Sequence, residues 1–231
     1  MIIASHRRSG THFLMQSLLM TFGKRFPLIK THGLAGELLA QQARIEYING
    51  EAPLPPGQYV PQPILYIVRD VRDCLTSNYH WWRTSMESKC GGIRPHFGDV
   101  TPAAYIRGEV TLKAVPTPNP GCSVTQEHLA LGIFTDPAGF WAAHVMSFLN
   151  HDLPVIRYED LLRFPRKTLL QVADRFELRR PWFPRAPRRL VGHDPRKGVI
   201  GDYRSLFDAE SLQIIWDKAG SVMERLGYGS S

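Results

Sequence analysis

Residues 7–11, Arg-Arg-Ser-Gly-Thr, combine two cations, two hydroxyls and one glycine within five positions. Residues 1–4 before them are apolar and predict a buried strand, and residues 13–20 after them are rich in helix formers. A strand, a tight loop and a helix start make an anion site. The reason is that N–H groups in the first turn of a helix lack intrahelical partners, and the helix dipole adds positive charge there. Gly10 lets the backbone approach the anion closely. We therefore predict that this loop holds a phosphate.

Three other polar residues stand where predicted strands end. They are His32, Arg69 and Tyr158, and they close or follow the apolar segments 26–30, 64–68 and 154–158. Predicted helices alternate with these strands, at residues 37–42, 73–83, 136–150, 165–176 and 208–226. This alternation predicts an α/β protein with a P-loop-like, three-layer α/β/α fold and a central, mostly parallel sheet, formed as a single domain over residues 1–231. In such sheets ligands bind at the carboxyl ends of the strands, so we expect the strand-end residues to converge there.

These positions suggest specific chemistry, each with a structural alternative. A histidine beside an anion loop fits a general base near neutral pH, although a lone histidine such as His32 is more often a surface or core residue. Arg69 and Ser77 flank the start of a predicted helix, where they can grip one phosphate; acidic capping of that helix is the alternative. Residues 196–198, Arg-Lys-Gly, form either another anion loop or a solvated turn.

Five segments of the chain resemble the sulfotransferases that use 3′-phosphoadenosine 5′-phosphosulfate (PAPS). Residues 8–13 resemble the end of the phosphosulfate loop Pro-Lys-Ser-Gly-Thr-Thr-Trp, and residues 30–32 its Lys-Thr-His segment. Residues 69–80 resemble the segment Arg-Asn-Pro-Lys-Asp followed by Ser-x-Tyr-His. Residues 158–161 resemble Tyr-Glu-Asp-Met/Leu, and residues 196–203 resemble Arg-Lys-Gly-x-x-Gly-Asp-Trp. The five segments keep the family's order and span nearly the whole chain.

The resemblance implies transfer of a sulfuryl group from PAPS to a hydroxyl or amine, with 3′-phosphoadenosine 5′-phosphate (PAP) as product and no metal. It implies catalytic roles for four residues: His32 as the base, with Arg8, Lys30 and Ser77. The nucleotide-binding residues that it implies are Arg7, Arg8, Ser9, Gly10, Thr11, His12, Phe13, Arg69, Ser77, Tyr158, Arg196, Lys197 and Gly198. In the phosphosulfate loop three positions depart from the family: Arg8 replaces a lysine, His12 a threonine, and Phe13 the tryptophan that stacks on adenine. In the segment that begins at Arg69, Asp70 and Val71 replace Asn-Pro.

Charge and loop sequence bear on the competing functions. The chain of 231 residues has a formal net charge of +7, which favours an anionic partner. Its arginines cluster at a few loops, a pattern that favours a small polyanion over nucleic acid. A P-loop nucleotide kinase is the alternative function, supported by the predicted fold and loop. The Walker form, however, needs a lysine after the glycine, and here the basic residues precede Gly10.

The remaining expectations concern compartment and acceptor. No apolar run reaches the ~18 residues of a membrane span, no basic-apolar leader opens the chain, and the three cysteines form no CxxC pair. These features predict a cytoplasmic protein without a membrane span or a zinc site. Residues 86–135 are expected to form a lid or acceptor-binding insertion, and the aromatic residues 79–82 either wall the acceptor pocket or lie in the core. We expect the acceptor to be a glycan, a glycolipid or a small metabolite; the oligomeric state stays open.

Overall fold

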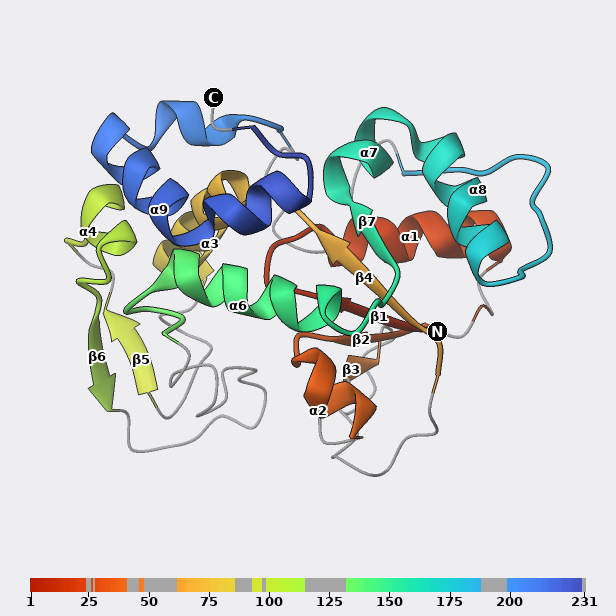
Figure 1. The fold of residues 1–231 in the computed structure, drawn as a ribbon, viewed down its shortest axis with the longest axis horizontal. Helices are drawn as coiled ribbons and strands as arrows, with labels where there is room; N and C mark the ends of the chain where they lie inside the picture. The colour runs from red at the N-terminus through yellow and green to blue at the C-terminus, as the bar shows by residue number, and fades with distance from the viewer. Residues whose placement is uncertain are drawn as a thin grey trace. The chain divides into compact units, whose positions relative to one another are not determined.

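Five strands form one sheet in the order β3-β2-β1-β4-β7 (Figure 1). β1 (Ile2–Ser5) lies parallel to β2 (Ile29–Thr31) and to β4 (Ile64–Val68), and β4 lies parallel to β7 (Val155–Arg157). β3 (Glu46–Tyr47) is the outermost strand on one side and pairs antiparallel with β2. β1 and β4 are buried along their whole length, as their apolar sequences predict. The expected α/β fold with a mostly parallel sheet is therefore confirmed.

The computed structural model describes residues 1–23, 26, 28–40, 46–47, 62–85, 93–96, 99–114, 132–187 and 199–229. The chain divides into two compact units. Unit 1 comprises residues 1–69 and 147–198 and contains the whole five-stranded sheet, and unit 2 comprises residues 70–146 and 199–231. The expectation of a single domain over residues 1–231 stays a prediction.

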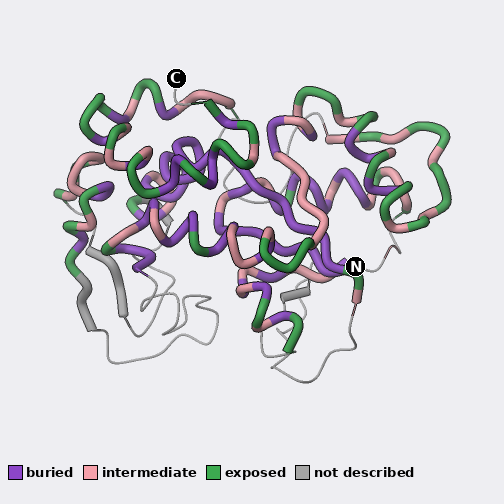
Figure 2. The backbone as a smooth tube through the Cα atoms, viewed as in Figure 1, coloured by how far each residue is buried: buried purple, intermediate pink, exposed green. Residues whose placement is uncertain are grey.

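Helices lie on both faces of the sheet within unit 1. On one face, Ile3, Leu65 and Ile67 belong to a core cluster with α1 (Thr11–Phe22), α7 (Tyr158–Arg163) and α8 (Pro165–Arg175). On the other face, the Tyr66 ring stacks on Phe148 in the last turn of α6 (Pro137–Leu149), with the centroids 4.1 Å apart. Strand alternation explains the division, because Tyr66 lies between Leu65 and Ile67 and points the opposite way. Figure 2 shows β1 and β4 as buried segments.

Unit 2 consists of helices and a small two-stranded sheet. α3 (Val71–Ser85) packs against α9 (Ala209–Arg225) and against the 3₁₀ turn η1 (Asp202–Ser205). β5 (Ile93–His96) pairs antiparallel with β6 (Thr111–Ala114). Trp82 of α3 is 2% exposed, and its ring lies 4.8 Å from that of Phe134, so this tryptophan is a core side chain. In the described part of the chain, no helix combines the length and apolarity that a membrane crossing requires.

The structure corrects the expectations for short elements. The stretch 86–135, expected to form a lid or acceptor-binding insertion, contains three short elements that the sequence patterns did not indicate: β5, β6 and α4 (Pro102–Ile106). β5 and β6 pair with each other, so neither shows the long apolar run of a buried strand. α4 has clear start signals: the Thr101 hydroxyl accepts from the Ala104 N–H at 3.2 Å, and a proline opens the helix. Residues 86–92, 97–98 and 115–131 of the expected lid lie outside the described residues.

Two further differences lie in unit 1. The strand expected over residues 154–158 ends at Arg157, and Tyr158 is the first residue of α7, a six-residue helix absent from the sequence-based expectation. α2 (Ala35–Leu39) begins earlier than the expected helix over residues 37–42, because the Glu37 carboxylate accepts the Leu34 N–H at 2.7 Å and so closes the first turn; it ends at Leu39. Both differences concern element ends and leave the order of the sheet unchanged.

Candidate active site

The parallel register brings four strand ends to one edge of the sheet in unit 1. Ser5 of β1 pairs with Ile67 of β4, and Thr31 of β2 pairs with Ala4. Val68, the last residue of β4, pairs with Arg157 at the end of β7. The loop 6–10, His32, Arg69 and Tyr158 therefore all continue from the same edge. Open parallel sheets bind their ligands at this edge.

The loop between β1 and α1 has the backbone of an anion site. Arg8 (φ 64°) and Gly10 (φ 92°) both adopt the left-handed conformation, and α1 begins directly afterwards at Thr11. The first α-helical bond runs from the Leu14 N–H to the Gly10 carbonyl at 3.1 Å. The N-cap residue Gly10 has no side chain with which to cap α1, and the first turn of this helix, residues 11–14, contains no acidic residue. The dipole of α1 and the loop cations thus give this edge a positive electrostatic potential.

The loop side chains differ widely in exposure. Arg7 and Ser9 are buried, Arg8 and Gly10 are half-buried, and His12 is exposed. Phe13, expected from the resemblance to stack on adenine, is buried in the core cluster of unit 1. Of the loop side chains that the resemblance assigns to the nucleotide, Arg8 and His12 are therefore the most accessible.

The Tyr158 ring packs against three parts of this edge. The Tyr158 ring centroid lies 5.9 Å from that of Phe13 in an edge-to-face contact. The guanidinium carbon of Arg69 lies 4.9 Å from the Tyr158 centroid and makes a cation–π contact with this ring. A Cβ added to Gly10 would overlap the Cδ2 of Tyr158, so glycine is required both by the left-handed φ and by this neighbour. Tyr158 therefore holds the loop in place and links it to the end of β4.

His32 is joined to the loop through Ser5. The Nδ1 of His32 lies 2.8 Å from the Ser5 carbonyl oxygen and 3.2 Å from the Ser5 hydroxyl. That hydroxyl lies 2.5 Å from the hydroxyl of Thr11, the first residue of α1. The Gly33 N–H donates to the Thr31 hydroxyl at 3.0 Å and turns the chain at the end of β2. Backbone and side-chain contacts thus orient the imidazole beside the loop.

The other expected site residues are distributed as follows. Lys30 is half-buried in β2, where its register partners are Ile3 of β1 and Glu46 of β3. Ser77 is buried in α3 of unit 2. Arg196, Lys197 and Gly198 lie outside the described residues. The structure therefore groups the loop, His32, Arg69 and Tyr158 in unit 1.

Charged residues at the start of α3 organise part of unit 2. Arg72 donates to both carboxylate oxygens of Asp70, at 3.0 and 2.8 Å. Burial opposes the charge of Arg72, but the hydrogen bonds and charge of Asp70 outweigh it, so the pKa of Arg72 is raised. The carboxylate of Asp73 accepts the Gly201 N–H at 2.7 Å and the Tyr203 N–H at 3.3 Å. Asp73 thus fixes the turn that follows the Arg-Lys-Gly segment 196–198.

Sequence reasoning did not identify three of these supporting residues. Ser5 acts largely through a backbone carbonyl, which leaves no signature in residue type. Tyr66 accepts the His6 N–H through its hydroxyl at 3.2 Å, although its place in an apolar run indicates only a core residue. Asp73 resembles an ordinary acidic residue in the first turn of a helix. Of the three, only Ser5 could have been identified from the sequence, because a polar residue at the last position of a buried strand is unusual.

Comparisons with known proteins agree with this fold. The sulfotransferase domain family model matches residues 62–180, which is more than half of the chain. Among the solved structures, the crystal structure of mouse sulfotransferase SULT7A1 complexed with PAP matches with a TM-score of 0.57 and 17% sequence identity. That match covers 98% of this chain and 87% of the mouse chain. A search of the curated proteins gave no match. On the strength of the family match, with the fold in agreement, this chain belongs to the sulfotransferase domain family.

Proposed function

We propose that this protein transfers a sulfuryl group from PAPS to a hydroxyl or amine of an acceptor, with His32 as the general base. One observation carries the proposal: a positively charged phosphate-type loop and a histidine share a hydrogen-bond network through Ser5 at the ligand-binding edge of a parallel sheet. Family membership supports the same reaction type. The PAP bound in the SULT7A1 structure supports PAPS as the donor.

The contacts of His32 favour the tautomer that a base needs. A carbonyl oxygen can only accept, so the 2.8 Å contact with Ser5 requires a proton on Nδ1. In the neutral imidazole, Nε2 then carries the lone pair and can take the acceptor's proton. The contact with Ser5 also holds the ring in one orientation, which removes an entropic cost from the proton transfer.

The balance of the reaction defines what the cations do. The acceptor oxygen or nitrogen forms a bond to sulfur, the bond from sulfur to the bridging phosphate oxygen breaks, and PAP leaves with the electron pair. The acceptor's proton passes to His32. Arg8 keeps its charge at any working pH, so we assign it the stabilisation of charge on the departing oxygen, together with Lys30. We do not assign Arg8 a role as a proton donor.

We propose that the nucleotide is held at both phosphorylated ends. The 5′-phosphate is assigned to the backbone and hydroxyls of residues 9–12, with support from the left-handed loop and the α1 dipole. The 3′-phosphate is assigned to Arg69. For Ser77 and for residues 196–198 the same assignment rests on the sequence resemblance alone. Tyr158 is proposed to contact the adenine side of the nucleotide. Glycans, glycolipids and small metabolites are the proposed acceptor classes.

Nucleotide binding followed by transfer tests this function. In calorimetric titrations, PAP should bind about 10- to 100-fold tighter than AMP, because charged hydrogen bonds to the 3′-phosphate are lost with AMP. Labelled PAPS incubated with fractionated metabolites should then yield a labelled acceptor in the presence of EDTA. Equal affinity for PAP and AMP, or ATP hydrolysis that EDTA abolishes, would contradict the proposal and favour the kinase.

Substitution of His32 tests the base directly. His32→Ala should reduce kcat by ~10²–10⁴ while PAP binding stays nearly unchanged. His32→Asn is the sharper variant, because an amide N–H can replace the Nδ1–H that faces the Ser5 carbonyl but cannot take a proton. Both variants should lose turnover, whereas His151→Ala, on an exposed turn, should keep it. Unchanged turnover in His32→Asn would rule out His32 as the base.

A further inference from the structure

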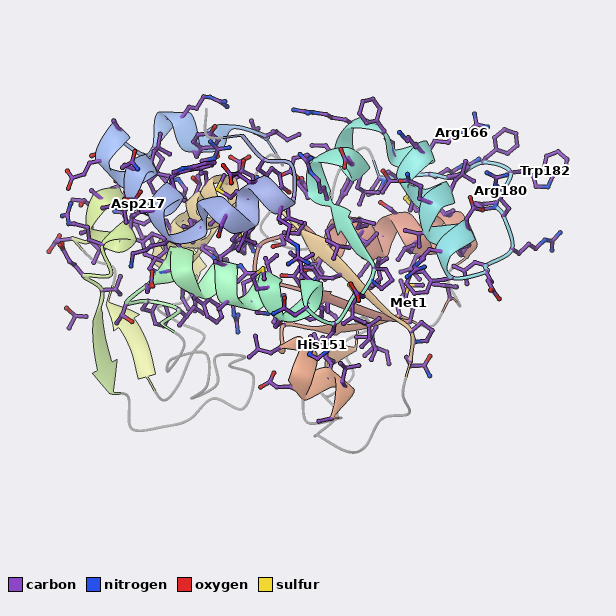
Figure 3. The ribbon with its side chains drawn as sticks, viewed as in Figure 1. Met1, His151, Arg166, Arg180, Trp182 and Asp217 are labelled. Atoms are coloured by element: carbon purple, nitrogen blue, oxygen red, sulfur yellow. The ribbon has the colours of Figure 1, made fainter. Side chains whose placement is uncertain are left out.

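An aromatic pair in unit 1 is unusually exposed. Trp182 and Phe183 are 85% and 73% exposed, the highest values among the large apolar side chains in the described residues. They lie in the loop that follows α8, and Figure 3 shows Trp182 projecting outward from this loop. Aromatic side chains of this size normally bury most of their surface in a core or an interface. Their exposure therefore points to a binding surface.

The loop that carries this pair is anchored at both ends. Before it, the Leu178 N–H donates to the Ala173 carbonyl at 2.8 Å, and Leu178 packs against the core cluster. After it, Arg185 and the Thr21 hydroxyl exchange two hydrogen bonds of 3.0 Å each, and Ala186 packs against the same cluster. The exposure of Trp182 and Phe183 thus results from a fixed backbone path.

Positive charge surrounds the pair. Residues 165–187 contain six cationic side chains and two carboxylates, a formal charge of +4 out of +7 for the whole chain. The six cations are all exposed: Arg166, Lys167, Arg175, Arg179, Arg180 and Arg185. Figure 3 shows Arg166 and Arg180 at the same margin of unit 1 as Trp182. Arg180 forms an exposed ion pair of 3.6 Å with Asp174, a carboxylate that the net charge of +4 already includes.

We propose that residues 165–187 dock onto the surface of an anionic lipid bilayer, with Trp182 and Phe183 inserted at the headgroup level. The exposed cations supply attraction to anionic headgroups, and aromatic side chains are favoured at the membrane interface. The combination of side chains favours a bilayer over a folded partner or a nucleic acid. Six exposed cations lie in the same segment as an exposed Trp-Phe pair, and segments that bind at an anionic membrane interface carry this mixture of basic and aromatic side chains.

Docking in this way leaves the proposed catalytic edge accessible. Arg185 is fastened to Thr21 near the carboxyl end of α1, whereas the phosphate-type loop precedes the amino end of the same helix. The 12 residues of α1 span about 18 Å. The proposed membrane surface and the proposed PAPS site therefore lie at opposite ends of α1, so substitutions at one should leave the other unchanged.

Vesicle co-sedimentation with the full chain tests the docking. The protein should sediment with vesicles of 70% phosphatidylcholine and 30% phosphatidylserine, at about 0.1 M salt, and stay in solution with phosphatidylcholine alone. Trp182→Ala with Phe183→Ala should reduce partitioning by at least about 10-fold. Arg179→Gln with Arg180→Gln should reduce it about five-fold for each arginine. PAP affinity should be unchanged in all of these variants.

Matched controls separate a specific surface from the general charge of the chain. Arg83→Gln with Arg225→Gln removes the same charge from unit 2, and Leu39→Ala removes an exposed apolar side chain elsewhere in unit 1. Each should change partitioning by less than about two-fold, because none of these residues belongs to the proposed docking segment 165–187. Absence of vesicle binding, equal losses in the control pair, or binding of single-stranded RNA that depends on Trp182 without vesicle binding would overturn the proposal.

Discussion

Two glycine turns in this molecule use the same backbone conformation for different purposes. Gly10 (φ 92°) precedes α1 in unit 1, and Gly201 (φ 85°) precedes η1 in unit 2. In unit 2 the N–H groups of Gly201 and Tyr203 donate to the carboxylate of Asp73. In unit 1, Gly10 has no side chain with which to cap α1, and residues 11–14 of the first turn include no acidic residue. The unit 2 turn thus holds an internal anion.

The comparison indicates how to distinguish a structural turn from a ligand site. A turn whose N–H groups already face a buried carboxylate gains stability from it and repels a second anion. A turn with the same backbone that directly follows two arginines, as Gly10 does, attracts an external anion such as a phosphate. The neighbouring carboxylate decides the role, and glycine alone does not.

The largest effect should come from adding a methyl group at the two glycines. Gly10→Ala combines a left-handed φ with overlap on the Tyr158 ring, strains of ~1–3 kcal/mol each, so PAP affinity should fall about 100-fold. In Gly201→Ala the added Cβ meets the flexible end of Arg204, and the loss should stay below about 10-fold. Isothermal titration with PAP measures both. Equal losses of PAP affinity in the two variants would contradict the assignment of a ligand-binding role to the Gly10 turn and a structural role to the Gly201 turn.

Removal of the internal anion should mainly affect stability. Asp73→Ala leaves two backbone N–H groups without their acceptor, and the residue is only 1% exposed, so the free energy of unfolding should fall by ~2 kcal/mol. Asp73→Asn retains one acceptor oxygen, so its free energy of unfolding should fall by less than that of Asp73→Ala. Urea unfolding measures the difference. A wild-type midpoint for Asp73→Ala would mean that the carboxylate does not hold the turn.

Arg69 is the residue that we expect to bind the 3′-phosphate of PAP. Arg69→Ala should weaken PAP about 10-fold more than adenosine 5′-phosphosulfate, because only PAP carries the 3′-phosphate. Loss of the cation–π contact with Tyr158 affects both ligands equally and cancels in the ratio. Competition binding with the two nucleotides gives that ratio. Equal losses of affinity for the two nucleotides would mean that Arg69 does not bind the 3′-phosphate.

The smallest effect concerns a helix that does have a carboxylate cap. The Ser211 N–H donates to Asp208 at 2.8 Å, and hydrogen bonds from Ser211 lower the pKa of Asp208 below its ordinary value. A lowered pKa in the folded state means that the carboxylate stabilises the fold above about pH 4 and loses this effect as pH falls through the folded pKa.

Asp208→Asn tests this pH dependence, because asparagine also caps helices but does not titrate. The urea midpoint of the variant should therefore fall less steeply than that of the wild type between about pH 4 and pH 2. Asp217→Asn, at an exposed carboxylate in the middle of α9, is the control for the loss of one carboxylate from the same helix. Parallel slopes for wild type and Asp208→Asn would contradict the assignment.

The sequence predicted those parts of the molecule that follow from local patterns. The continuous apolar run 64–68 and the polar residues that follow each strand predicted a parallel sheet with residues of interest at one edge. Short elements escaped this reasoning. α7 has six residues and β5 contains a proline, so neither shows a clear period. Tyr158, assigned to a strand end, instead starts a helix.

What the sequence determined by itself is the alternation of the parallel strands with the longer helices, the positive loop before α1 and the family pattern, because these depend on residues close together in the chain. Tertiary structure decided which atoms meet. It joined His32 to the Ser5 carbonyl, set Tyr158 against Gly10, and bound Asp73 to Gly201, a residue 128 positions away. Such contacts depend on the packing of distant segments and often use backbone atoms, which every residue has, so no local pattern can specify them.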